Sequence, residues 1–206
     1  MRRFLLADDH HIVRTGLSLL IKEEFLTAEV DECRNGDEVL KKIQTTAYDL
    51  IILDITMPGT DSLHLLKNIF THQPEQKVMI FSMSSTGIYG KKYLHLGVKA
   101  FVNKEAEPSD VRKAIAAILD NRRYPGPSVQ YILTHEDLPS QSSTPFDNLS
   151  VRELEIMNHL IAGKNVSEIA ETLCLHISTV STHKSNIMQK LGVSNVIELN
   201  RLAQLF

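Results

Sequence analysis

The sequence is poor in cysteine and contains no long apolar run. Its two cysteines, Cys33 and Cys174, are too few for a disulfide framework and lack CxxC spacing, which favours a reducing environment. No apolar run approaches the ~18–20 residues that a membrane-spanning helix requires, so we expect no membrane contact. Residues 4–7 form the first apolar stretch, which ends at two aspartates and is too short for a secretory signal. These absences together predict a cytoplasmic protein.

The chain also lacks an excess of charge of either sign. It contains 22 Lys and Arg residues and 25 Asp and Glu residues. This balance excludes a uniformly basic surface that would bind nucleic acid, but it does not exclude a local basic patch. The composition, 43% hydrophobic and 23% charged, is typical of a globular protein and excludes full disorder. The nine histidines are scattered, and the adjacent pair His10 and His11 has no His-x3-His spacing, so we expect no zinc site.

Residues 1–120 alternate short apolar runs with segments of helical periodicity. Five runs have the length and composition of strands: residues 3–7, 28–33, 50–53, 77–81 and 100–102. The first, third and fourth are nearly continuous in apolar residues, as expected for strands buried on both faces of a parallel sheet. Five strands that alternate with five helices predict a doubly wound α/β domain with a five-stranded parallel sheet.

The pattern changes after this first domain. Residues 121–146 contain a Tyr-Pro-Gly-Pro break and a second stretch rich in Pro and Ser, which together predict a linker. In residues 147–206 every periodic segment is helical, and we expect a small all-α domain of four helices. These helices are expected to begin near Ser150, Asn165, Ser178 and Asn195. The second and third helices are joined by a tight turn, which predicts a helix-turn-helix.

Polar side chains follow the predicted strands at the edge where parallel strands end. Asp8 and Asp9 follow the first strand, Asp54 the third, Ser82 the fourth and Lys104 the fifth. In the common strand order 2-1-3-4-5 the first and third strands are neighbours, so the three carboxylates converge where such sheets bind ligands. Carboxylates this close repel one another and require a cation, and an oxygen-only ligand set suits Mg²⁺.

Lys104 and Ser82 indicate an anion beside this cation, because an ammonium and a hydroxyl both bind phosphoryl oxygens. A carboxylate, a metal ion, an ammonium and a hydroxyl together predict phosphoryl transfer to an aspartate. A phosphatase of the haloacid dehalogenase type would use the same nucleophile, but it requires a second Asp two residues later. Thr56 stands at that position, which argues against this enzyme.

These residues and their spacing make residues 3–120 resemble a response-regulator receiver domain, which has a flavodoxin-like fold. The matching motifs are Asp8-Asp9, Asp54-Ile55-Thr56-Met57-Pro58, Ser82 and Phe101-Val102-Asn103-Lys104. The resemblance implies that Asp54 is the phosphoacceptor. It also implies that Mg²⁺ is bound by Asp8, by Asp9, by Asp54 and by the backbone carbonyl of Thr56.

The same resemblance gives roles to further residues of this domain. Ser82 and Lys104 would bind the phosphoryl group, and Phe101 would be the switch aromatic whose rotation reports phosphorylation. Thr56, two residues past the acceptor, stands where a side chain could tune autodephosphorylation. The receiver would catalyse only its own phosphoryl transfer and autodephosphorylation, so we do not class the protein as an enzyme.

The third helix of the C-terminal segment, residues 178–191, has two different faces. Val180, Ile187 and Leu191 form a core stripe, while the other face carries small hydroxyls, an amide and a lysine. Such side chains can reach the floor and phosphates of the DNA major groove, although a solvated helix face explains the composition at least as well. Residues 145–206 hold five basic and six acidic residues, which indicates modest, strongly salt-dependent binding by a monomer.

The C-terminal segment resembles a LuxR-type helix-turn-helix domain. The matching motifs are Leu149-Ser150-x-Arg152-Glu153, Gly163, Glu168-Ile169-Ala170, Thr179-Val180-x-x-His183 and Lys190-Leu191-Gly192-Val193. The resemblance implies that the third helix reads the major groove. Ser181, Thr182 and Ser185 would face the bases, and Thr179 and Lys184 would contact phosphates.

The chain as a whole resembles a two-component response regulator of the NarL/FixJ type. The resemblance predicts a transcription regulator that a sensor histidine kinase phosphorylates on Asp54, and that binds double-stranded promoter half-sites as a homodimer once activated. His176 replaces the Ser that usually caps the third helix, so this helix is expected to begin at Ser178 or to fray. Two alternatives stay open: a phosphorylation-independent regulator whose receiver serves dimerisation, and a receiver with protein–protein output and a tail that does not bind DNA.

Overall fold

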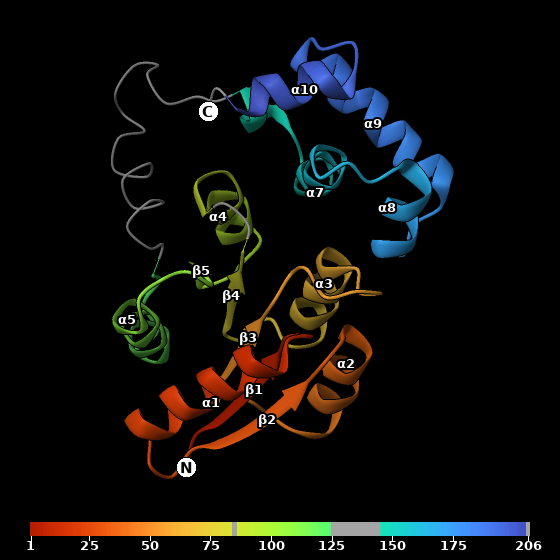
Figure 1. Cartoon of the computed structure of the whole chain (residues 1–206). Helices are drawn as coiled ribbons and strands as arrows, with labels where there is room; N and C mark the ends of the chain where they lie inside the picture. The colour runs from red at the N-terminus through yellow and green to blue at the C-terminus, as the bar shows by residue number, and fades with distance from the viewer. Residues whose placement is uncertain (84–85, 125–144, 205–206) are drawn as a thin grey trace. The chain divides into compact units, whose positions relative to one another are not determined.

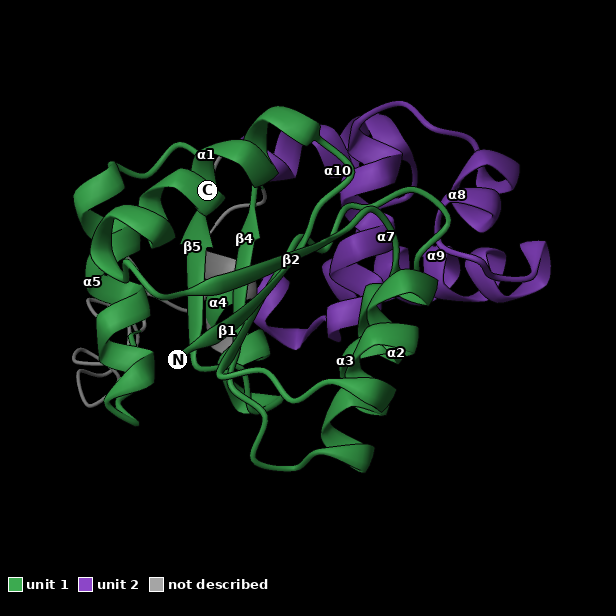
Figure 2. Ribbon diagram, turned by 90° about the horizontal axis from the view of Figure 1, so that it is seen from below, with its two compact units in different colours: residues 1–135 green, residues 136–206 purple. Residues whose placement is uncertain are grey.

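The computed structural model of the chain describes residues 1–83, 86–124 and 145–204 (Figure 1). The chain separates into two compact units, residues 1–135 and residues 136–206, which Figure 2 colours differently. Most of the predicted linker, residues 125–144, lies outside the described residues, so the predicted boundaries at 120 and 147 stay predictions. No helix in the described ranges is long and apolar enough to span a membrane.

The first unit contains a five-stranded, entirely parallel sheet. Its strands are β1 (Arg3–Ala7), β2 (Glu29–Cys33), β3 (Leu50–Leu53), β4 (Val78–Ser82) and β5 (Ala100–Asn103). They lie in the order β2-β1-β3-β4-β5. Each predicted strand is present, with its ends shifted by at most one residue, and the predicted flavodoxin-like fold is confirmed.

Helices cover both faces of this sheet. They are α1 (His11–Glu24), α2 (Gly36–Thr45), α3 (Ser62–His72), α4 (Thr86–His95) and α5 (Pro108–Leu119). On one face, Leu17 and Ile21 of α1 and Ile115 of α5 join a buried cluster with Phe4 and Ile52 of the sheet. Figure 1 shows α2 and α3 on the opposite face. This double cover explains why every residue of β3 and β4 is buried and why both strands read as continuous apolar runs.

The second unit is helical. It contains a 3-10 helix (Pro145–Asn148) followed by α7 (Val151–Ile161), α8 (Val166–Thr172), α9 (Ile177–Leu191) and α10 (Val196–Ala203). Capping boxes open α7 at Ser150 and α8 at Asn165, as the sequence predicts. Gly192 ends α9 with a positive φ of 66°, a conformation that glycine adopts without strain.

The start of α9 differs from the prediction by one residue. The helix begins at Ile177 rather than Ser178, with His176 at the N-cap position. As expected, the His176 ring makes no side-chain capping hydrogen bond. Val180 and Ile187 are fully buried, so packing of the inner stripe, rather than a cap, holds this end of the helix in place.

Candidate functional site

Strand register brings the predicted strand-end residues together. Ala7 of β1 pairs with Leu53 of β3, and the Asp54 amide donates to the Ala7 carbonyl at 2.8 Å. Asp8 and Asp54 therefore extend from neighbouring positions, and only 2% and 1% of their surfaces are exposed. At the other side of the site, the Lys104 amide donates to the carbonyl of the buried Ser82 at 3.0 Å.

The Lys104 ammonium joins two of the buried carboxylates. Its Nζ lies 2.7 Å from Asp8 Oδ2 and 2.7 Å from Asp54 Oδ2. Burial on its own lowers the pKa of Lys104, but the hydrogen bonds and charges of Asp54 and Asp8 outweigh burial and raise the pKa above its usual value. Lys104 is therefore a firmly protonated counter-ion at the nucleophile proposed from the sequence.

Thr56 also binds the Asp54 carboxylate. The Thr56 amide donates to Asp54 Oδ1 at 3.0 Å, and the Thr56 hydroxyl lies 2.8 and 2.9 Å from the two carboxylate oxygens. A hydroxyl has one proton, so it is shared between these oxygens. The sequence predicts the Thr56 carbonyl as a metal ligand. The structure adds a contact between the Thr56 side chain and the Asp54 carboxylate.

The acidic residues fit a divalent cation. Asp8, Asp9, His10 and Asp54 each offer one ligand atom, and these four atoms all lie within 4.8 Å of one another. Asp9 Oδ1 is a buried atom that receives no hydrogen bond from the described residues, although His10 Nδ1 lies 2.9 Å away. Carboxylate oxygens in such a cluster are the donors that Mg²⁺ prefers. His10 was not predicted to belong to this site.

A buried arginine holds the backbone of the acidic cluster. Arg14 of α1 donates from Nη1 to the Asp8 carbonyl at 2.7 Å and from Nε to Glu32 Oε2 at 2.8 Å. Only 2% of Arg14 is exposed. Arg14 therefore fixes the turn that carries Asp8 and Asp9. Arg14 was not predicted to belong to this site.

Phe101 occupies the interior of the receiver. It lies in β5, is fully buried, and its ring centroid is 5.7 Å from that of Tyr93 at an interplanar angle of 41°. The ring is therefore inward in this structure, with Lys104 paired to Asp54. Its rotation on phosphorylation stays a prediction.

The predicted DNA-contacting residues lie along the outer side of α9. Ser181, Thr182 and Ser185 are exposed, while Thr179 and Lys184 are partly exposed. The Thr182 hydroxyl donates to the Ser178 carbonyl at 2.9 Å, and the Ser185 hydroxyl donates to the Ser181 carbonyl at 3.1 Å. Each hydroxyl oxygen keeps acceptor capacity, so these side chains can still bind base edges.

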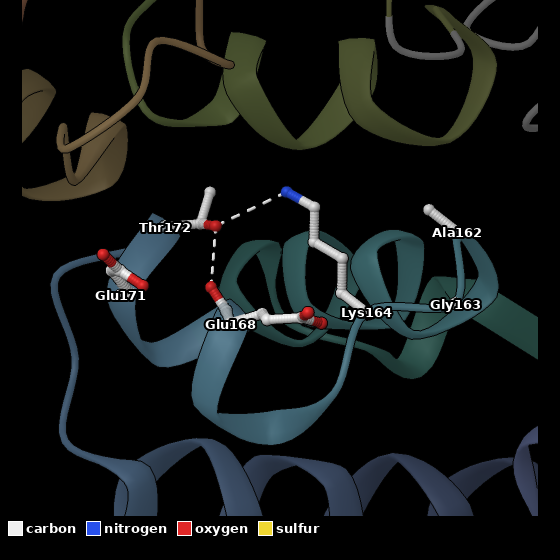
Figure 3. Close-up of a pocket in the computed structure, with 6 residues that line it drawn as sticks. All are labelled: Ala162, Gly163, Lys164, Glu168, Glu171 and Thr172. Carbon is white, nitrogen blue, oxygen red and sulfur yellow. Dashed lines mark hydrogen bonds between the residues drawn. The ribbon is translucent and has the colours of Figure 1, made fainter.

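A shallow hollow lies beside α8 in the same unit (Figure 3). It is lined by Ala162, Gly163, Lys164, Glu168, Glu171 and Thr172. Lys164 Nζ lies 3.4 Å from the Thr172 hydroxyl, which donates to the Glu168 carbonyl at 2.7 Å. The Glu168 carboxylate accepts from the Asn165 amide in the capping box, so it serves the start of the helix. We assign no chemistry to this hollow.

Comparison with known proteins assigns each of the two units to a protein family. Residues 4–116 match the response regulator receiver domain, and residues 147–203 match the bacterial regulatory proteins of the luxR family. The response regulators GacA of Pseudomonas viridiflava and UvrY of Escherichia coli are each 29% identical over 204 residues. These matches cover 98% of this chain and 95% and 94% of the relatives. The Fimbriae Z protein of Salmonella typhimurium is 30% identical, covering 95% of this chain and 92% of that protein.

Solved structures of a related regulator match this chain over nearly its whole length as well. RcsB from Salmonella enterica serovar Typhimurium, bound to the promoter rprA in the presence of the phosphomimetic BeF3⁻, has a TM-score of 0.72. It is 27% identical, and the match covers 98% of each chain. Another structure of the Salmonella typhimurium RcsB response regulator has a TM-score of 0.77 and 28% identity, covering 98% of this chain and 96% of that one. The chain belongs to the two-component response regulators that combine a receiver with a LuxR-type DNA-binding domain, a family in which phosphorylation typically controls transcription.

Proposed function

We propose that Asp54 accepts a phosphoryl group from the phosphohistidine of a sensor kinase, and that this modification strengthens binding of the C-terminal unit to promoter DNA. The observation that carries the proposal is the buried Asp54 carboxylate, which Lys104 binds at 2.7 Å within an acidic cluster. A carboxylate held in this way is oriented for in-line attack on phosphorus.

The residues around Asp54 would have different roles in the phosphoryl transfer. An Asp54 oxygen attacks phosphorus, the bond from phosphorus to the histidine nitrogen breaks, and an acyl phosphate forms on Asp54. The Lys104 ammonium and the Ser82 hydroxyl stabilise the charge on the transferred oxygens. Asp8, Asp9, Asp54 and the Thr56 carbonyl would hold Mg²⁺, which supplies further charge neutralisation when bound.

Hydrolysis of the acyl phosphate would return the protein to its resting state. Water attacks phosphorus, the bond from phosphorus to the Asp54 oxygen breaks, and inorganic phosphate leaves. The Asp54 carboxylate then again accepts the hydrogen bonds of Thr56 and Lys104. The chain would then catalyse only reactions of its own side chain, which is why we describe it as a regulator and not as an enzyme.

The outer side of α9 would contact DNA. Ser181, Thr182 and Ser185 are placed for base edges, and Thr179 and Lys184 for phosphates. Few basic groups are available, because residues 145–206 carry five basic and six acidic residues. A homodimer on two half-sites would supply the missing affinity, and one related structure is of two RcsB dimers bound to two parallel DNAs. Both proposed partners, a sensor histidine kinase and promoter DNA, would place the protein in the cytoplasm.

Labelling by a small phosphodonor tests the acceptor directly. Incubation with acetyl phosphate and Mg²⁺ should add one phosphoryl group to the parent, measured as intact mass, and none to Asp54→Asn. The amide is nearly isosteric with the carboxylate but cannot attack phosphorus. Asp37→Asn, on an exposed position of α2, is the matched control and should label like the parent. Equal labelling of parent and Asp54→Asn would overturn the assignment.

A further inference from the structure

The His10 imidazole lies against the acidic cluster. His10 Nδ1 is 2.9 Å from Asp9 Oδ1 and 3.2 Å from Asp8 Oδ1. His10 occupies the N-cap position of α1, yet its side chain makes no capping hydrogen bond. The side chain is 63% exposed, so burial does not hold it in place either. The contacts that hold the ring are therefore those of Nδ1 with the two carboxylates, one of which is a hydrogen bond to Asp8 when Nδ1 carries the proton.

The spacing of these atoms matches neighbouring positions around one metal ion. In an octahedral site with metal–ligand distances of ~2.1 Å, adjacent ligand atoms are about 3.0 Å apart. The two distances from His10 Nδ1 to the carboxylate oxygens, 2.9 and 3.2 Å, bracket that separation. The ligand atom of Asp54 lies within 4.8 Å of the other three.

We propose that His10 adds a nitrogen ligand to the divalent cation bound by Asp8, Asp9 and Asp54, and so shifts the preference of the site from Mg²⁺ toward first-row transition-metal ions. Imidazole nitrogen is a poor ligand for Mg²⁺ and a good one for Co²⁺ and similar ions. The neutral ring would use the lone pair of Nδ1 and leave Nε2–H exposed to solvent. This inference rests on the proposed function, because it requires the acidic cluster to bind a cation.

Pulsed electron paramagnetic resonance on bound Mn²⁺ detects such a ligand without any activity measurement. Coupling to a directly bound ¹⁴N nucleus should appear in the parent and disappear in His10→Gln. His11→Gln is the matched control, because His11 is the adjacent exposed histidine and its Nδ1 lies 3.4 Å from Arg14 instead. Both changes are on exposed residues, and circular dichroism checks that both variants fold.

Calorimetric titration gives a second readout. The affinity for Co²⁺ should fall at least about tenfold in His10→Gln, as for the loss of one supporting group at a metal site. The affinity for Mg²⁺ should change much less, so the Co²⁺-to-Mg²⁺ preference falls. Proportional losses of both affinities would overturn the inference.

The outcomes separate this inference from the proposed function. If Mn²⁺ binds to the parent and is lost in Asp9→Asn, but ¹⁴N coupling is absent or survives in His10→Gln, the nitrogen ligand is refuted and the cation site stands. If the parent binds no divalent cation, or Asp9→Asn binds it equally well, both proposals fail at the acidic cluster.

Discussion

The Lys104 ammonium lies 2.7 Å from Asp8 Oδ2 and 2.7 Å from Asp54 Oδ2, so a single cation joins the two buried carboxylates that directly follow β1 and β3. Before any metal binds, this ammonium offsets the repulsion between the two acids. It also fixes the end of β5 against the centre of the sheet. Lys104 therefore stabilises the resting receiver, and it also belongs to the proposed phosphoryl-binding site.

Replacement of Lys104 by Met should destabilise the protein in the absence of divalent cations. Removing one partner of a buried ion pair typically costs ~3–5 kcal/mol, because the remaining charges lose their counter-ion. Urea denaturation in chelator at neutral pH measures this loss for the receiver. Lys113→Met removes the exposed ammonium that pairs with Asp110 at 2.8 Å and should change little. Similar unfolding midpoints for Lys104→Met and Lys113→Met would contradict the counter-ion role.

The Thr56 hydroxyl should slow phosphorylation of Asp54. It shares its proton between the two carboxylate oxygens, and this hydrogen bond must be given up when one oxygen attacks phosphorus. Thr56→Val preserves the shape and the backbone donor, so a hydrogen bond of roughly 1 kcal/mol predicts labelling by acetyl phosphate about fivefold faster. Thr56→Ser keeps the hydroxyl and should label like the parent. Slower labelling of Thr56→Val would show that the hydroxyl assists attack.

His159 should make the C-terminal unit sensitive to acid. Burial, followed by the charge of Lys164, lowers the pKa of His159 below its usual value. The unfolded chain therefore binds a proton at His159 more readily than the folded chain does. The contribution of neutral His159 to the stability of the folded state is complete above about pH 6.5, and it is lost as the pH falls through the folded-state pKa. Proton NMR should place the His159 titration below about pH 6.5, the usual value for histidine, with His159→Gln identifying its signal. A His159 midpoint at or above about 6.5, or an unchanged acid dependence of stability in His159→Gln, would refute this.

Two substitutions on α9 should have different effects on DNA binding. Lys184→Ala should weaken binding to a selected site and to random DNA by similar factors, and should reduce the salt slope by roughly one phosphate contact. Thr182→Ala should instead change sequence preference, since a lost base contact typically costs ~1–3 kcal/mol. Fluorescence anisotropy with both DNAs at two salt concentrations distinguishes these effects. If both variants bind both DNAs like the parent, α9 does not lie in the groove.

The sheet could be predicted because its central strands are buried on both faces. Residues such as Leu50–Leu53 leave a continuous apolar run in the sequence, and the polar residue after each run marks the functional edge. The contacts of Arg14, His10 and the Thr56 hydroxyl could not be predicted in this way. They depend on where side chains point across turns and between strands, and spacing along the chain does not determine those directions.

The link between Asp54 and DNA binding is tested most directly by measuring the affinity for a selected DNA site with and without beryllofluoride and Mg²⁺. Sedimentation under the same conditions reports the dimer fraction. In the parent, the affinity and the dimer fraction should rise together, because the acyl-phosphate mimic at Lys104 and Ser82 favours one of two receiver states. Asp54→Asn should show neither change. An unchanged affinity and dimer fraction in the parent would contradict phosphorylation control and favour a regulator whose receiver serves only dimerisation.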